Sequence, residues 1–307
     1  MVLLLFVGTV YQWIGIQKDQ GAFLPVGQLY DVYGKKMHLY SDGTGEVTVV
    51  FASGWGTVSP YTDFYPLTRR FASFAKVAVY DRPGTGFSEL TGRKRDIDSM
   101  VDEIHTLLQA SGQKPPYVFV GHSLGSLETI RYAQIYPEEV KGILLIDGGT
   151  PEYYGEMPAI AAISHIQRFV VNTGIARALL QSRKIWTAIQ SERNELKELP
   201  EELQDLEKRA LLLKGFNRNM TDELRLSKVN AVKVSEGAKP LDVPLIALTA
   251  GGFGQTEVRW LESQKEWVGW STDAEQKAVR ASKHYIHHYE PDLVIEQLKK
   301  LVRNERS

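Results

Sequence analysis

The most constraining part of this sequence is residues 118–125, which read VFVGHSLG. A buried-strand pattern leads there into Gly-x-Ser-x-Gly, and residues 127–136 continue as a helix-forming segment. Glycines at 121 and 125 allow a turn too tight for a Cβ, so Ser123 should be strained, with its Oγ exposed at the carboxyl edge of a sheet. The amides of the next helix then point toward any oxyanion formed there. We interpret Ser123 as a nucleophile; the alternative is a capping serine in a glycine-rich turn.

Strand and helix patterns alternate on both sides of this turn. Continuous apolar or β-branched runs predict buried strands at 47–52, 77–80, 142–146 and 243–249. We also expect a hairpin over 29–40, helices at 63–74 and 96–111, a helix near 257–267, a short strand near 277–280, and a final helix from residue 293. Strands that alternate with helices indicate an α/β fold with a doubly wound, mostly parallel sheet.

Residues 150–240 interrupt this alternation with helical segments at 160–171, 175–190 and 192–213 and no convincing strand. We interpret the stretch as an α-helical insertion on the carboxyl edge of the sheet, where open α/β folds bind ligands. Its charge run at 192–209 is typical of a solvated helix face. The predicted domains are an apolar segment (1–20), a core (21–149 and 241–307) and a helical cap (150–240).

The first residues, MVLLLFVGTVYQWIGI, carry no charged side chain before Lys18. The run is shorter than the about 20 apolar residues of a membrane span, and it lacks the basic start and clear cleavage site of a signal peptide. Tyr11 and Trp13 suit an anchor at the membrane interface. We therefore expect a marginal membrane anchor through residues 1–16 on a protein that is otherwise cytoplasmic or secreted. The alternative is a helix packed on the globular body.

The amino-acid composition limits which partners and which kinds of site the protein can have. The 36 Lys and Arg nearly balance the 37 Asp and Glu among 307 residues, and no basic block stands out, so we expect no nucleic-acid partner. The absence of cysteine excludes disulfides, thiolate metal sites and a cysteine nucleophile. The sequence gives no indication of the oligomeric state.

A serine hydroxyl needs a base to take its proton and a carboxylate to orient that base. His284 is the best-placed histidine, because it follows the last short strand in a loop at the carboxyl edge of the sheet. His287 and His288 are its rivals. For the acid, Asp147 closes a buried strand ahead of two glycines, whereas Glu257 lies several residues beyond the next strand and is typical of a helix start. Asp147 is the preferred acid and Glu257 the alternative.

Acyl transfer also needs donors for an oxyanion. One should be the N–H of Leu124, directly after the nucleophile. The other should come from the loop after strand 47–52, which reads SGWG at 53–56 and would present the N–H of Trp55. An ordinary glycine turn is the alternative for this loop.

Taken together, these residues resemble the α/β-hydrolase superfamily over residues 27–302. The matching segments are SGWG at 53–56, YDRPGTGFS at 80–88, GHSLG at 121–125, and HYIH at 284–287 with Pro291. The resemblance implies the order Ser123, acid, His284, and a helical cap between the sixth and seventh core strands. The sequence departs from the usual pattern of the superfamily at two positions of the expected site. Ser53 stands where many members have histidine, and the usual acid after the penultimate strand is absent, which points to the variant that takes it from the preceding strand, Asp147.

The resemblance and the residues predict a serine hydrolase that cleaves an ester or related acyl bond of a small molecule, like a carboxylesterase or lipase, with no cofactor or metal. Aminopeptidase, thioesterase, C–C hydrolase and cofactor-free peroxidase activities use the same triad and stay open, as does a non-catalytic ligand-binding member of the fold. A serine nucleophile disfavours dehalogenase and epoxide-hydrolase chemistry, which uses aspartate in this superfamily. Apolar and aromatic residues of the cap and core loops favour a lipophilic substrate: Phe169, Trp186, Phe216, Trp55 and Phe253.

Overall fold

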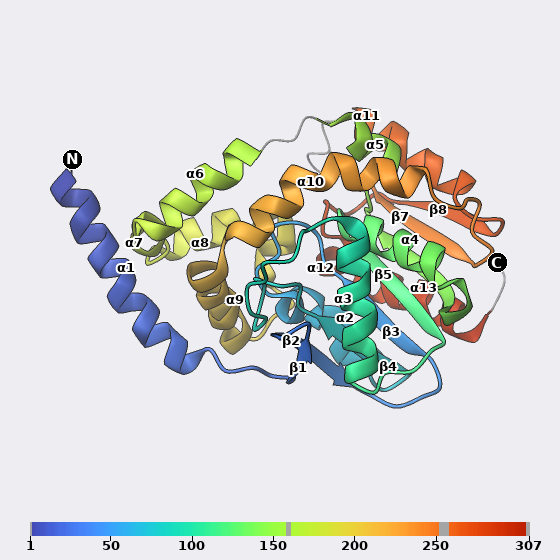
Figure 1. The fold of residues 1–307 in the computed structure, drawn as a ribbon, viewed down its shortest axis with the longest axis horizontal. Helices are drawn as coiled ribbons and strands as arrows, with labels where there is room; N and C mark the ends of the chain where they lie inside the picture. The colour runs from blue at the N-terminus through green and yellow to red at the C-terminus, as the bar shows by residue number, and fades with distance from the viewer. Residues whose placement is uncertain (1, 158–160, 252–257, 305–307) are drawn as a thin grey trace.

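A mixed, mostly parallel sheet forms the centre of the molecule. The computed structural model describes residues 2–157, 161–251 and 258–304. In this part of the chain eight strands follow the order β1-β2-β4-β3-β5-β6-β7-β8 (Figure 1). They are β1 (Gln28–Val32), β2 (Lys35–Asp42), β3 (Thr48–Ala52), β4 (Lys76–Tyr80), β5 (Tyr117–His122), β6 (Val140–Ile146), β7 (Leu245–Ala250) and β8 (Ala274–Val279). Only the β1–β2 and β2–β4 pairs are antiparallel. The predicted doubly wound α/β class is confirmed.

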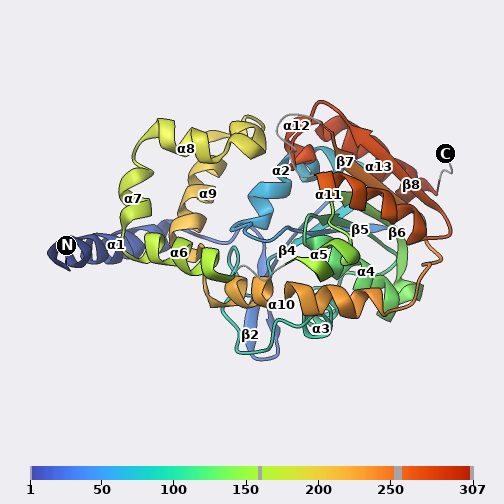
Figure 2. The ribbon, with the colours of Figure 1, turned by 90° about the horizontal axis from the view of Figure 1, so that it is seen from above.

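Helices cover both faces of this sheet, which explains why its central strands are apolar throughout (Figure 2). One face carries α3 (Ile97–Ala110) and α4 (Gly125–Ile135), which pack with the sheet in one apolar cluster. The other face carries α2 (Pro60–Phe71), the short α12 (Ile286–Tyr289) and α13 (Pro291–Arg303), which form a second cluster. All five residues of β3 are buried. The carboxyl ends of the strands are therefore held in a rigid frame.

The insertion between β6 and β7 is helical, as predicted. It contains α5 (Pro151–Glu156), α6 (Ala161–Asn172), α7 (Ile175–Leu179), α8 (Arg183–Ile189), the 3₁₀ segment η2 (Ser191–Leu196), α9 (Glu201–Lys214) and α10 (Arg218–Ser235). Helices α6 to α9 lie to one side of the sheet, whereas α10 runs back over α3 and α4 (Figures 1 and 2). Ala231 and Val234 of α10 join the core cluster of that face. After β7 come α11 (Val258–Ser263) and the 3₁₀ segment η3 (Gln264–Gly269).

The charge run at 192–209 is not simply a solvated face, so that interpretation was wrong for two of its residues. Arg193 and Glu207 are both buried and pair with each other. The Nη2 atom of Arg193 also lies 3.1 Å from Oδ1 of the fully buried Asp63 on α2. Charges can be buried where partners neutralise them, and here one partner comes from a distant part of the sequence.

The N-terminal run forms α1 (Val2–Ala22), which packs beside α6 and α9. Its contacts are partly polar: Gln12 donates from Nε2 to the carbonyl oxygen of Leu212 at 3.0 Å, and Asp19 pairs with Nη1 of Arg177 at 2.6 Å. Phe6 and Trp13 remain exposed. No helix in the described part of the chain is both long and apolar enough to cross a membrane. Shallower membrane contact through residues 1–16 stays a prediction.

Candidate active site

Ser123 occupies the tight turn that its flanking glycines predict. The residue joins β5 to α4 and has φ +52°, a left-handed conformation that is strained for a serine. Gly125 is required by close packing, because a Cβ there would lie 2.5 Å from the carbonyl oxygen of Ala52. The turn is tied to the neighbouring strand end through the Ser123 N–H, which donates to the Ile146 carbonyl at 3.3 Å.

Asp147 and His284 meet beside this turn. Asp147 follows β6, and His284 lies in the loop after β8; Nδ1 of the imidazole is 2.6 Å from Oδ2 of the carboxylate. The carboxylate is fully buried, and its Oδ1 accepts from the Ala250 N–H at 3.0 Å and from Nε1 of Trp260 at 3.2 Å. These two donors fix the direction of the carboxylate. His284 keeps 28% of its side chain exposed and lines the pocket described below.

Trp260 was not identified from the sequence, since nothing in the spacing of α11 relates it to Asp147. Glu257, the alternative acid, lies outside the described residues. The contact between Asp147 and His284 makes Asp147 the acid of our proposal.

The rival histidines lie deeper in the molecule. His287 and His288 of α12 are fully buried, with Nε2 atoms 3.4 Å and 3.3 Å from Oδ1 of Asp63. Burial lowers the pKa of His288 to about 3. His122, next to the nucleophile, is also buried, and its ring lies 4.8 Å from that of His284 and 5.0 Å from that of His287. Burial holds the pKa of His122 well below its ordinary value, which favours a neutral packing role.

Donor atoms of Asp63, His287 and His288 lie within 4.8 Å of one another, a spacing compatible with a metal ion. The Arg193 guanidinium already pairs with Asp63, however, and lowers the pKa of that carboxyl against the opposing effect of burial. A fixed positive charge beside the carboxylate opposes a second cation. We interpret this cluster as a buried ion pair that joins the insertion to the core.

The predicted oxyanion loop lies directly against the nucleophile turn. A Cβ on Gly54 would lie 2.9 Å from the Cβ of Ser123, so only glycine allows this approach. Within the described ranges, no hydrogen-bond acceptor is found for the backbone N–H of Trp55 or of Leu124. Unpaired N–H groups beside a nucleophile are what an oxyanion hole requires.

A pocket of about 330 Å³ opens onto these residues. Ser123, His284, Leu124 and Trp55 line it on the core side. Its remaining wall comes mainly from the insertion: Tyr154, Met157, Ile163, Leu224 and Ser227, with Tyr285 from the core. The wall is largely apolar.

Tyr154 is a pocket residue that the sequence did not reveal. Its ring fits over Gly149, where a Cβ would lie 2.4 Å from the ring. Two of the aromatic residues expected to shape the substrate site lie at it. Trp55 lines the pocket, and the ring of Phe216 packs against the ring of Trp55, with centroids 6.2 Å apart. Phe169 is exposed instead, Trp186 is not among the described residues that line the pocket, and Phe253 lies outside the described residues.

Comparisons with known proteins agree with the fold. A family model described as alpha/beta hydrolase fold matches residues 47–166. The chain is 29% identical over 313 residues to the uncharacterized protein YbdG of Bacillus subtilis (strain 168), covering 100% of this chain and 95% of that relative. It is 33% identical over 111 residues to the pimeloyl-(acyl-carrier protein) methyl ester esterase of Shewanella woodyi, covering 36% of this chain and 39% of that protein.

Among solved structures, the meta-cleavage product hydrolase of Pseudomonas fluorescens IP01 aligns with a TM-score of 0.66 at 16% identity. The alignment covers 91% of this chain and 98% of that one. At this identity the likeness concerns the fold alone.

Proposed function

We propose that this chain, which belongs to the α/β-hydrolase superfamily, is a serine hydrolase that cleaves an ester or related acyl bond. One observation carries the proposal: a buried carboxylate, Asp147, holds Nδ1 of His284 at 2.6 Å in a pocket that Ser123 also lines. Ser123, Asp147 and His284 come from separate strand ends and have the chemistry of a nucleophile, an orienting acid and a base.

In the proposed reaction, Oγ of Ser123 attacks the acyl carbon while Nε2 of His284 takes the hydroxyl proton. Asp147 holds Nδ1, which leaves Nε2 for this transfer and stabilises the imidazolium that forms. The N–H groups of Leu124 and Trp55 stabilise the tetrahedral oxyanion. His284 then protonates the leaving group, and water hydrolyses the acyl-enzyme by the reverse sequence of proton transfers. This chemistry needs neither a metal nor a cofactor.

The apolar pocket wall supports a lipophilic small-molecule acyl substrate. Met157, Ile163 and Leu224 offer surface to an acyl or alkyl chain but no charge to a substrate carboxylate or ammonium group. The Shewanella woodyi relative is named as a methyl ester esterase, which favours ester cleavage. The Pseudomonas fluorescens structure is of a meta-cleavage product hydrolase, so a C–C hydrolase is the second candidate; thioesterase and aminopeptidase activities would use the same three residues.

A substrate panel tests the proposal. Purified protein and its Ser123→Ala variant are assayed on p-nitrophenyl esters from acetate to laurate, a thioester, an aminoacyl anilide and a vinylogous 1,5-diketone. We expect ester turnover that rises with acyl length and is absent in Ser123→Ala. Exclusive cleavage of the diketone would favour the C–C hydrolase. No turnover by folded wild-type protein would favour a ligand-binding member of the fold.

A further inference from the structure

The oxyanion loop is held by a buried arginine. Arg82 follows β4, and its side chain is 3% exposed. Its Nη1 donates to the carbonyl oxygen of Ser53 at 2.9 Å, and its Nη2 donates to that of Gly54 at 2.8 Å. One guanidinium group therefore binds two successive carbonyls of the loop.

These two bonds fix the direction of the proposed oxyanion donor, the N–H of Trp55. In a trans peptide the C=O and the following N–H point in opposite directions. Because the Gly54 carbonyl points toward Arg82, the N–H of Trp55 in the same peptide group points away from Arg82. Trp55 lines the pocket together with Ser123. Rotation of this peptide would replace the donor with a carbonyl oxygen, which repels an oxyanion.

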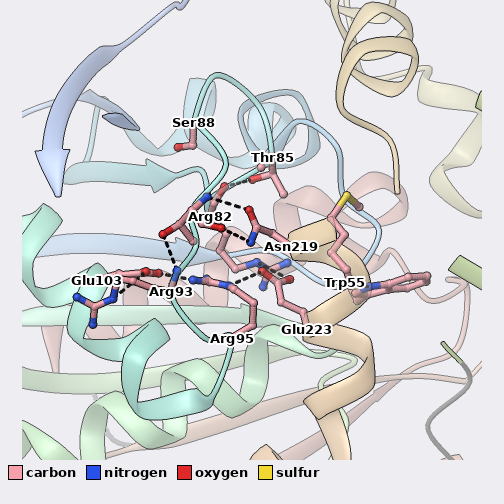
Figure 3. Close-up of polar contacts among 12 residues, drawn as sticks. Trp55, Arg82, Thr85, Ser88, Arg93, Arg95, Glu103, Asn219 and Glu223 are labelled. Carbon is pink, nitrogen blue, oxygen red and sulfur yellow. Dashed lines mark hydrogen bonds and ion pairs between the residues drawn. The ribbon is translucent and has the colours of Figure 1, made fainter. Parts of the chain in front are cut away.

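Arg82 is in turn held by carboxylates from two elements. Its Nη1 lies 2.7 Å from Oε1 of Glu128 on α4, and its Nε lies 3.4 Å from Oε2 of Glu223 on α10. Glu128 and Glu223 are each 2% exposed. Figure 3 shows that the charged array continues from Glu223 to Arg95 and Glu103. Buried charges need nearly fixed partners, so Glu128 and Glu223 restrict how Arg82 can move.

Helix α10 reaches both the loop and the pocket. The carbonyl of Met220 accepts from Nε1 of Trp55 at 2.7 Å, and Glu223 pairs with Arg82. Leu224 and Ser227 line the pocket. The spacing of these four residues places them on one face of the helix. A substrate that packs on Leu224 thus contacts the helix face that also holds the oxyanion loop.

We propose that Arg82 is a positioning residue for the Trp55 oxyanion donor. We also propose that Glu223, on α10, couples the position of Arg82 to the helical insertion. The inference rests on the proposed serine-hydrolase function and deepens it. Arg82 does not touch the reacting atoms; it sets the orientation of a peptide group that does. Its loss should therefore weaken stabilisation of the tetrahedral intermediate more than substrate binding.

The test compares Arg82→Lys with Arg177→Lys. Arg177 is also buried and also combines an ion pair with a side-chain hydrogen bond, but it joins α7 to α1 away from the pocket. For each variant we measure kcat and KM on the best ester, the inhibition constant of a trifluoromethyl ketone, and that of the matching secondary alcohol. The ketone forms a tetrahedral oxyanion on the serine, whereas the alcohol reports only pocket binding.

We expect Arg82→Lys to lower kcat and the affinity for the ketone together, by about 10²-fold, as for loss of an oxyanion donor. KM and the affinity for the alcohol should change by less than about threefold, and Arg177→Lys should change none of these constants, because only Arg82 holds the donor. Equal losses for ketone and alcohol, or an unchanged kcat in Arg82→Lys, would overturn the inference.

If Arg82→Lys does not fold, as judged by its thermal transition, Glu223→Gln replaces it. This change keeps the side-chain volume and removes the charge that faces Arg82. Its control is Glu103→Gln, which is equally buried and contacts Arg95 but not Arg82. A selective loss of ketone affinity in Glu223→Gln alone supports the inference, and its absence contradicts it. Failure of the wild-type enzyme to hydrolyse any ester would instead refute the proposed function.

Discussion

His284 presents Nδ1 to a fully buried carboxylate oxygen of Asp147 at 2.6 Å, although the two residues lie in loops after different strands. If this contact orients the base, Asp147→Asn should lower kcat by about 10⁴-fold, because the amide favours the wrong imidazole tautomer. Steady-state hydrolysis of the best ester measures the effect. Glu257→Gln provides the comparison, and it should leave kcat within about threefold of wild type. A larger loss in Glu257→Gln than in Asp147→Asn would assign the acid to Glu257.

Much of this site could be predicted from local sequence. The strand, the two glycines and the helix around Ser123 specify the turn because backbone sterics act over a few residues. His284 could be placed because it follows a strand at the carboxyl edge, where loops of a parallel sheet converge. The hairpin of β1 and β2 was likewise predicted, around Gly34 and Lys35.

The features that sequence reasoning missed depend on long-range packing. Arg193 and Glu207 looked solvated within a charge run, yet they are buried because Asp63 of α2 provides a charged partner. Trp260 donates to Asp147 from a helix far along the chain, and Tyr154 reaches the pocket because Gly149 leaves room for its ring. No local periodicity encodes such pairings.

His288, one of two buried histidines of α12, should make the stability of the fold depend on pH. Burial lowers the pKa of His288 from its ordinary value of 6.5 to about 3 in the folded protein. Between these values the unfolded chain binds a proton that the folded chain does not, so the free energy of unfolding falls as the pH falls. The slope for this one group is up to about 1.4 kcal/mol per pH unit.

Urea unfolding at pH 7, 6 and 5 measures this slope. His288→Gln should reduce it, because glutamine does not titrate, whereas His165→Gln at an exposed position should leave it unchanged. Identical slopes in wild type and His288→Gln would show that His288 does not titrate as the structure indicates.

The pocket wall from α10 should control acyl-chain preference. Leu224→Ser removes apolar surface from a wall that also contains Met157 and Ile163. We expect kcat/KM for a long-chain ester to fall by about 10-fold while that for the acetate changes little, since burying a leucine side chain contributes about 1.5–3 kcal/mol. The exposed Val229→Ser on the same helix is the control. Equal losses for both esters would argue that Leu224 does not contact the acyl chain.

The apolar side chains of α1 lead to a prediction about lipid. Phe6 is 65% exposed and Trp13 is 62% exposed, and such residues favour the membrane interface. We propose that this helix binds lipid surfaces, and expect the Phe6→Ser, Trp13→Ser double variant to lose about 10-fold or more of its vesicle binding. Co-sedimentation with mixed neutral and anionic vesicles measures it. Wild-type protein that stays in the supernatant would exclude this role.

The proposed hydrolase activity requires that His284 activates Ser123. Its most direct test is labelling with a fluorophosphonate, which reacts with activated serines, followed by peptide mapping of the adduct. We expect a stoichiometric adduct on Ser123 that is lost in His284→Ala, while His287→Gln, if folded, still reacts. Folded wild-type protein that forms no adduct, or an adduct on Ser123 that persists at the same rate in His284→Ala, would contradict this activation.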